Sequence, residues 1–574
     1  MKRKIIDVPQ IRGAMEELLR WQREKSNFLA RVENEEEFYR LRVSPKGHRN
    51  SDGERFAPTS AWLLNTVLQK HADLMEHIPT AACLAREPGD EADAKALSQI
   101  LPVILERNNF EDTYSDNMWY KLKHGVCAYG VFWNGELENG LGDIDVRRVD
   151  MRNLYWQPNV RDIQDSRGVY YVERIDAATL QARFPHYDGS PCDFGGLLPI
   201  DVEGDQILVV DWYYKKRTPE GRTVLHYCKF VGECVLFASE NEEGYENGWY
   251  EHGEYPFVLD VLYPIEGEGV GFGMIALARD PQTYIDRMDR NLLEYMDWAT
   301  RVRFFCKKST GVDEQAFADL SRLIVDVEGD LDEERLRQIC VQDPDAFWLN
   351  LKNAKINELK ETTSSRDVLL GIPDGGVTAA SAIAALQEAG NKTVRDIVSA
   401  SYRSFVRMVR LVIECVRQFY SEARCFRILG ENGKYSYLSF SNEGIAERTV
   451  GTMTDGTPIS RRPVFDIDVR AVKKDPYTRL SHNETMKDLY RMGVFQPENA
   501  AQASLLLSNM DFSGIGLLRE QVAALARATA PQGGVSLPQS HEADTEQTEP
   551  KEPLARAFEE AERLREQAAK GTEL

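Results

Sequence analysis

The sequence lacks the cysteine and histidine spacings on which disulfide scaffolds and metal sites depend. Its nine cysteines are odd in number, are scattered along the chain and form no C-x-x-C pair. Its nine histidines include no H-E-x-x-H or other close pairing, and His71 and His77 would lie on different faces of a helix. These absences exclude a disulfide scaffold and a zinc ribbon, and they predict buried thiols in a reducing compartment.

Long apolar runs are absent as well. No uncharged apolar stretch approaches the roughly 20 residues that a membrane-spanning helix needs. Charged residues and Pro9 interrupt the N-terminal stretch MKRKIIDVPQ, so no signal peptide is expected. The sequence therefore predicts no membrane partner and a chain that is soluble and cytoplasmic when it is made.

Basic residues are outnumbered by acidic ones. The chain has 70 Lys and Arg against 92 Asp and Glu, which gives a formal net charge of −22. A surface this acidic does not hold nucleic acid or an anionic membrane through its net charge. Two interpretations remain open at this point: simple solubility, or a surface that must stay near DNA without adhering to it.

A glycine-rich stretch, GIPDGGVT at 371–378, leads into an alanine-rich segment as many phosphate-binding loops do. A P-loop requires G-x-x-x-x-G-K-[ST], because its lysine reaches the phosphates and its hydroxyl binds Mg²⁺. The stretch has no lysine, and Asp374 would repel phosphate. The sequence GENGKYS at 430–436 places Tyr435 where Ser or Thr is needed. ATPase chemistry is therefore not predicted.

One order of residues resembles a nuclease site. Asp345, Glu358 and Lys360 follow the PD…ExK pattern, which needs carboxylates on adjacent strands that share a metal ion. Here Asp345 is predicted to cap a helix, and Glu358 and Lys360 would lie on different faces of it. No G-x-S-x-G elbow appears either. We predict a chain that is not an enzyme and has no cofactor and no metal; a Mg²⁺-dependent nuclease without a recognisable motif is the enzymatic alternative.

Length and composition allow two to four folded domains, and the first half of the chain reads as mixed α and β structure. Helical periodicity is present at 11–42, 61–78, 91–107 and 111–125. Residues 126–264 then alternate short β-rich runs with Gly, Asp, Asn and Pro, which predicts a mostly antiparallel sheet. GEGVGFGMI at 267–275 has no surrounding βαβ unit and is predicted to be a flexible connector.

The second half begins with two helices that flank a small insert. Asp280 and Pro281 are predicted as the N-cap and first residue of a helix over 281–300. The insert, 301–345, contains strand patterns at VRFFCKK and LIVDVE and helix patterns at DEQAFADLSRL and DEERLRQI. A second helix is predicted over 346–367.

A very long helix is predicted over 379–420, where apolar residues keep the helical period for about 60 Å. Such a length suits a spine between domains or an oligomer interface. Residues 424–472 return to β patterning, and the capping-box sequence SHNE opens short helices up to residue 530. The acidic segment 531–574 is low in apolar residues and is expected to be disordered.

The order of these segments resembles the portal proteins of tailed bacteriophages and prophages. The residues that carry the resemblance are GVCAYGVFWNG, VDMRNLYWQPNVRDIQDSRGVYYVERI, YPFVLDVLYPIEGEGVGFGMIALARDPQTYIDRMDRNLL and GGVTAASAIAALQEAGNK. The resemblance extends to about residue 530. It implies an α+β, multidomain portal-type subunit with these parts: N-terminal arm 1–45, wing 46–279, stem helix 280–300, clip 301–345, stem helix 346–367, tunnel loop 368–378, spine helix 379–420, wing return 421–475, helical crown 476–530 and tail 531–574.

By the same resemblance, the protein would form a ring, a dodecamer in similar portals, at one capsid vertex of the virion, after assembly in the host cytoplasm. Double-stranded DNA would pass through its channel during packaging and ejection. Its partners would be the terminase large subunit, the major capsid or scaffolding protein, and a head-to-tail adaptor or tail protein. The implied channel residues are Gly371, Ile372, Pro373, Asp374, Gly375, Gly376, Val377 and Thr378, with Lys352, Lys355 and Lys360 as candidate basic positions. A non-viral helical scaffold is the remaining alternative.

Overall fold

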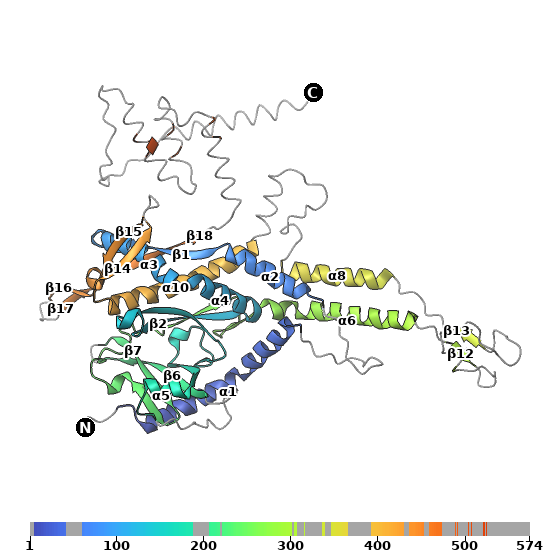
Figure 1. Cartoon of the computed structure of the whole chain (residues 1–574), viewed down its shortest axis with the longest axis horizontal. Coiled ribbons are helices and arrows are strands. Elements are labelled where there is room, and N and C mark those ends of the chain that lie inside the picture. The colour runs from blue at the N-terminus through green and yellow to red at the C-terminus, as the bar shows by residue number, and fades with distance from the viewer. Residues whose placement is uncertain are drawn as a thin grey trace, which may run out of the picture. The chain divides into compact units, whose positions relative to one another are not determined.

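The computed structural model describes residues 5–41, 60–187, 206–218, 221–300, 304–306, 336–338, 346–364, 392–429, 435–452 and 458–472, with single residues elsewhere (Figure 1). The chain divides into two units, Met1–Thr478 and Arg479–Leu574. Only single residues of the second unit are described, so the fold that follows is that of the first.

The helices of the first unit confirm most of the periodicities seen in the sequence. They are α1 (Val8–Tyr39), α2 (Trp62–Met75), α3 (Glu91–Arg107), α4 (Phe110–His124), α5 (Ala177–Arg183), α6 (Met274–Thr300), α8 (Ala346–Thr362) and α10 (Lys392–Phe419). Helix α1 begins before the predicted residue 11, because Asp7 and Gln10 form a capping box and Pro9 lies in the first turn. Of the long helix predicted over 379–420, α10 confirms the part from Lys392; residues 379–391 lie outside the described part.

The strands pair antiparallel throughout the described part, as predicted. The largest sheet has the order β4-β5-β6-β7-β8, and a smaller one has the order β3-β2-β9. Their strands are β2 (Val126–Asn134), β3 (Asp143–Val149), β4 (Leu154–Trp156), β5 (Gly168–Asp176), β6 (Gln206–Arg217), β7 (Thr223–Val231), β8 (Cys234–Ala238) and β9 (Phe257–Val261).

The remaining strands form two-stranded ribbons. These are β10 (Tyr263–Pro264) with β11 (Gly271–Phe272), β12 (Phe304–Cys306) with β13 (Leu336–Gln338), β14 (Arg424–Leu429) with β15 (Tyr435–Phe440), β16 (Arg448–Thr452) with β17 (Pro458–Arg461), and β1 (Ile78–Ala85) with β18 (Phe465–Val472). The predicted helix DEERLRQI is wrong at 336–338, where β13 pairs with β12 instead, from Phe304↔Gln338 to Cys306↔Leu336. Pairing across the insert prevails over local helix propensity there.

Strand β1 was not predicted from the sequence. It pairs with β18 over its whole length, from Ile78↔Val472 to Ala85↔Phe465. Pro79, directly after the helical pattern at 61–78, is the second residue of this strand. A two-stranded ribbon leaves one side of each strand without a partner, so the N–H that proline lacks is tolerated there. The pairing joins two segments that lie almost 400 residues apart in the sequence.

The prediction that the glycine-rich stretch 267–275 is a flexible connector is wrong for residues 271–275. Residues 271–272 form β11, and Gly273 packs so closely on α4 that an added Cβ would lie 2.1 Å from the Lys123 carbonyl oxygen. Gly125, which ends α4 with φ +84°, is equally close to the Phe272 backbone. These glycines permit two backbones to touch, which fixes where α6 begins.

Helix α6 begins at Met274, so the prediction that Asp280 and Pro281 start it is wrong. Pro281 lies inside the helix. The first two turns bury Met274, Ile275 and Ala278 completely, and this burial outweighs the hydrogen bond that the proline cannot donate.

The main core lies between α3, α4, α10 and the strands β2 and β9, and a second core lies where α1 covers the five-stranded sheet. Helix α1 contributes Ile11, Leu18 and Trp21 to the second core, with the Trp21 ring edge-on to Tyr170 at 5.3 Å. The expected buried thiols are found at Cys83, Cys127, Cys228 and Cys415, whereas Cys425 is exposed.

Acid stability is expected to depend on His252. Its Nδ1 accepts a hydrogen bond from the Glu254 N–H at 3.0 Å, and its ring stacks on Tyr250. Burial, with Arg462 and Lys215 nearby, lowers the pKa of His252 to about 3. Because an unfolded histidine titrates near its ordinary pKa of about 6.5, unfolding takes up a proton between these values, and stability falls as the pH falls through that window.

The His252→Phe variant keeps the ring stacking and removes the titration. We expect its stability to depend less steeply on pH between pH 6.5 and 3, by up to about 1.4 kcal/mol per pH unit. Urea unfolding at several pH values measures the slope, with His186→Phe at an exposed position as the control. An unchanged slope in His252→Phe would contradict this assignment.

Candidate functional site

Helices α6 and α8 lie side by side as a pair, which Figure 1 shows in green and yellow. Lys352 of α8 forms an ion pair with Asp289 of α6. The Lys355 ammonium lies 5.4 Å from the ring centroid of Tyr284, also on α6. An ion pair and a cation–π contact therefore hold together α6 and α8, the two helices predicted to flank the insert.

The start of the pair is anchored on α2 by a buried polar cluster. The Gln282 side chain accepts from the Leu63 N–H at 3.1 Å and donates to the Ser60 carbonyl at 2.8 Å. Asp286 accepts from both the N–H and the hydroxyl of Ser60 at 2.9 Å. Burial nevertheless raises the pKa of Asp286. Residues of α6 thus satisfy N–H groups at the start of α2, whose own N-cap residue, Ala61, has no side-chain acceptor.

The end of α8 is anchored on the same helix. The buried Lys70 of α2 donates to the Ser364 carbonyl at 3.1 Å, and burial lowers the pKa of Lys70. The hydroxyl of Thr363 donates to the Leu359 carbonyl at 2.8 Å. These bonds hold the last described residues of α8 and its C-terminal turn in place.

Large apolar side chains are exposed on both helices of the pair. On α8, Phe347 and Leu349 are each 61% exposed and Trp348 is 50% exposed, and Leu293 of α6 is 39% exposed. Successive helical residues point about 100° apart, so three exposed apolar neighbours surround the helix rather than line one face. Exposure of this kind is typical of a surface that another chain covers.

The lysines singled out from the sequence are engaged within the subunit. Lys352 pairs with Asp289, Lys355 pairs with Glu358 at 2.6 Å, and Lys360 lies 5.8 Å from the ring centroid of Trp62. The glycine-rich stretch Gly371 to Thr378 lies outside the described residues.

The nuclease alternative gains no support from the structure. Glu358 is bound to Lys355 on the same helix, and Asp345 lies outside the described residues. Within the described part of the chain, no three His, Cys, Asp or Glu side chains are placed to share a metal ion. None of the helices described is long and apolar enough to cross a membrane.

Sequence reasoning missed the buried contacts that hold the long helix α10. The Lys121 ammonium of α4 lies 2.8 Å from the Asp260 carboxylate of β9 and donates to the Ser401 hydroxyl of α10 at 2.7 Å. Lys121 and Asp260 are 0% and 1% exposed. No motif signals this pair, because its members lie 139 residues apart and each resembles an ordinary surface residue.

The described part of the chain is thus an α+β body that anchors a helix pair with exposed apolar residues. The model of the phage P22-like portal protein family matches residues 73–572. The chain therefore belongs to the P22-like phage portal protein family, and its role is that of a head-to-tail connector in DNA packaging. A search of curated proteins finds no match.

Proposed function

We propose that the chain assembles into a closed ring, a dodecamer, at one vertex of the capsid, and that double-stranded DNA enters and leaves through its channel. The observation that carries this proposal is the exposed apolar surface of α6 and α8, defined by Leu293, Phe347, Trp348 and Leu349. Repeated contact of one surface with a different surface of the next copy generates a ring when the rotation closes.

In this proposal, α6 and α8 form the stem, the insert that contains β12 and β13 forms the clip, and α10 is part of the spine that crosses the wing. Residues 368–378 form the tunnel loop, with the channel constriction at Gly371–Thr378. Lys352, Lys355 and Lys360 remain candidate channel-facing positions. The polar cluster of Ser60, Gln282 and Asp286 supports a rigid stem, because it ties α6 to the body by several hydrogen bonds.

The charge of the chain fits passage of DNA without adhesion. Twelve chains of charge −22 carry roughly −260 in total, which disfavours attachment of a phosphate backbone to the ring. We infer that the energy of translocation comes from a separate terminase docked on the clip. The other partners are the capsid or scaffolding protein and, after packaging, an adaptor or tail protein. The ring assembles in the host cytoplasm and stays in the virion.

The exposed apolar surface provides a direct test of subunit contact. The double variant Trp348→Lys/Leu349→Lys is expected to remain folded and to lose ring assembly, because charged side chains would be buried against the next subunit at a cost of several kcal/mol. Size-exclusion chromatography with light scattering measures the assembly state.

The matched control is Leu137→Lys/Leu141→Lys, which places two lysines at exposed leucines in the turn between β2 and β3. This control should assemble like the unaltered chain. Rings of normal size and yield from Trp348→Lys/Leu349→Lys would show that this surface is not the contact.

A further inference from the structure

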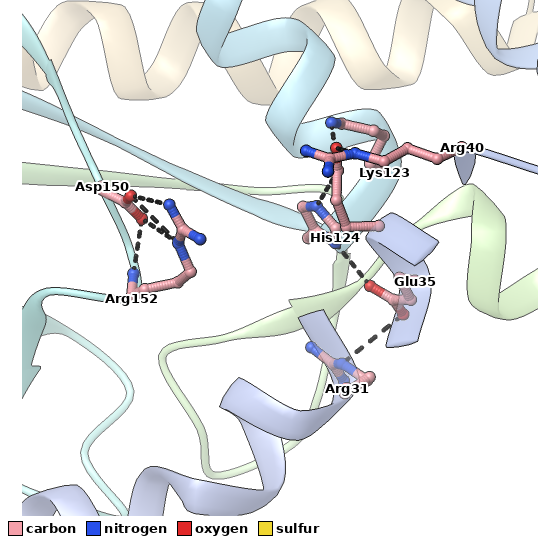
Figure 2. A network of polar contacts seen from close by, with 8 residues as sticks. Arg31, Glu35, Arg40, Lys123, His124, Asp150 and Arg152 are labelled. Atoms are coloured by element: carbon pink, nitrogen blue, oxygen red, sulfur yellow. Dashed lines mark hydrogen bonds and ion pairs between the residues drawn. The ribbon is translucent and has the colours of Figure 1, made fainter. Parts of the chain in front are cut away.

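A polar cleft of about 780 Å³ lies between α1, the end of α4 and the strands β3 to β5. Its volume is in the range of small-molecule sites. Helix α1 forms one wall and precedes residue 73, where the family match begins. Figure 2 shows the network of charged residues beside it, in which α1 and α4 meet.

An ion network adjoins the cleft (Figure 2). His124 of α4 contacts the Glu35 carboxylate of α1 through Nδ1 at 2.8 Å, and both side chains are buried. Lys123 pairs with Glu36 at 2.6 Å, and Arg152 forms a two-pronged pair with Asp150 (Figure 2). In these pairs each charge is compensated by its partner, and the pairs between α1 and α4 hold these two walls of the cleft together.

Two cations of the cleft, Arg148 and Arg174, form no ion pair among the described residues, although Arg148 also attracts the nearby Asp150 carboxylate. Arg148 lies over the Tyr120 ring at 5.0 Å, and Arg174 is exposed at the rim. Acidic side chains also line the cleft: Glu36 is paired, and Glu33 and Glu37 are exposed on α1. In a chain of net charge −22, two unpaired arginines facing one cleft favour an anion.

Two tyrosines that line the same cleft have buried hydroxyl groups. Tyr120 is 7% exposed and Tyr155 is 1% exposed, and neither hydroxyl has a hydrogen-bond partner within the described part of the chain. Burial raises the pKa of both tyrosines, that of Tyr155 to about 12, so both remain O–H donors at neutral pH. A buried donor without a partner is costly, and a bound acceptor would satisfy it.

An aromatic extension adjoins the charged part. A second cavity of about 330 Å³ shares Tyr120, Lys123 and Arg148 with the cleft and adds Tyr39, Asp116 and Trp119. Aromatic rings offer a surface on which a planar base stacks. The combination of arginines, tyrosine hydroxyls and adjacent rings matches a ligand with a phosphate at one end and a base at the other.

We propose that this cleft binds a nucleoside 5′-phosphate, either as a free nucleotide or as the phosphorylated end of a DNA strand. Arg148 and Arg174 receive the phosphate, the hydroxyls of Tyr120 and Tyr155 donate to its oxygens, and the base lies toward Tyr39 and Trp119.

Isothermal titration of the full chain with dAMP, inorganic phosphate and deoxyadenosine tests the proposal. We expect dAMP to bind more tightly than either inorganic phosphate or deoxyadenosine. Arg148→Gln/Arg174→Gln should weaken dAMP binding about ten-fold or more, whereas the matched pair Arg20→Gln/Arg23→Gln on exposed positions of α1 should not.

A second variant separates binding from folding. Tyr120→Phe/Tyr155→Phe removes only hydroxyls that have no partner, so the free protein should keep its stability while dAMP binding weakens. Competition with blunt duplexes, with and without a 5′-phosphate, identifies which form of the ligand the cleft binds. If only the phosphorylated duplex displaces dAMP, the ligand is a DNA end. If neither duplex displaces dAMP, the ligand is a free nucleotide. No binding of dAMP, or equal binding by the unaltered chain and both variants, would overturn the proposal.

Discussion

A chain that carries Gly375→Pro and Gly376→Pro is expected to form rings and to package little or no DNA. The two glycines lie in GIPDGGVT, between α8, which ends at Thr362, and α10, which begins at Lys392. Glycine permits backbone conformations that other residues rarely adopt, and proline fixes φ and removes an N–H donor. If the loop must move around passing DNA, two prolines block that movement without affecting contacts between subunits.

The same substitution elsewhere supplies the control. Gly533→Pro/Gly534→Pro makes an identical change in the C-terminal segment, which is not assigned to the channel. Packaged DNA is measured as nuclease-protected DNA in particles, and rings are counted by electron microscopy. Normal packaging by Gly375→Pro/Gly376→Pro would refute the role of the loop, and loss of rings would mean that the loop acts in assembly instead.

Replacement of Lys121 by methionine is expected to destabilise the body by about 3–5 kcal/mol, because it leaves the Asp260 carboxylate buried without its countercharge. The pair joins α4 to β9, and the Ser401 and Ser404 hydroxyls of α10 complete the cluster at 2.7 Å from Lys121 and 3.3 Å from Asp260. Loss of the pair therefore weakens the packing of both α10 and β9 against α4.

Urea unfolding of the full chain, followed by circular dichroism, measures this effect. Arg86→Met is the control, since Arg86 and Asp466 form an exposed pair, and exposed ion pairs contribute little to stability. The double variant Lys121→Met/Asp260→Leu should regain much of the loss, because no buried charge remains in it. Equal midpoints for Lys121→Met and Arg86→Met would contradict the assigned role.

The sequence pattern of neighbouring residues predicted the helices and strands that depend mainly on those residues. The bounds of α3, Glu91–Arg107, follow from helical periodicity, and the antiparallel sheets follow from short β-rich runs between turn residues. The family was recognised from the order of segments rather than from any catalytic motif, and the match over 73–572 confirms it.

The errors arose where distant segments decide the structure. Strand β1 exists because β18 pairs with it, and the start of α6 is set by the contact of Gly273 with Lys123 rather than by Asp280 and Pro281. The polar anchors of the helix pair could not be predicted either, since Gln282 acts on residues more than 200 positions away. A single sequence carries no signal for such pairs.

We propose above that this chain builds a ring with a channel. Negative-stain electron microscopy of the purified full-length protein tests it most directly, with the sample examined at high concentration and under assembly conditions. We predict closed rings with a central opening, dodecameric when class averages are examined for symmetry. A protein that remains monomeric under all these conditions would contradict the claim.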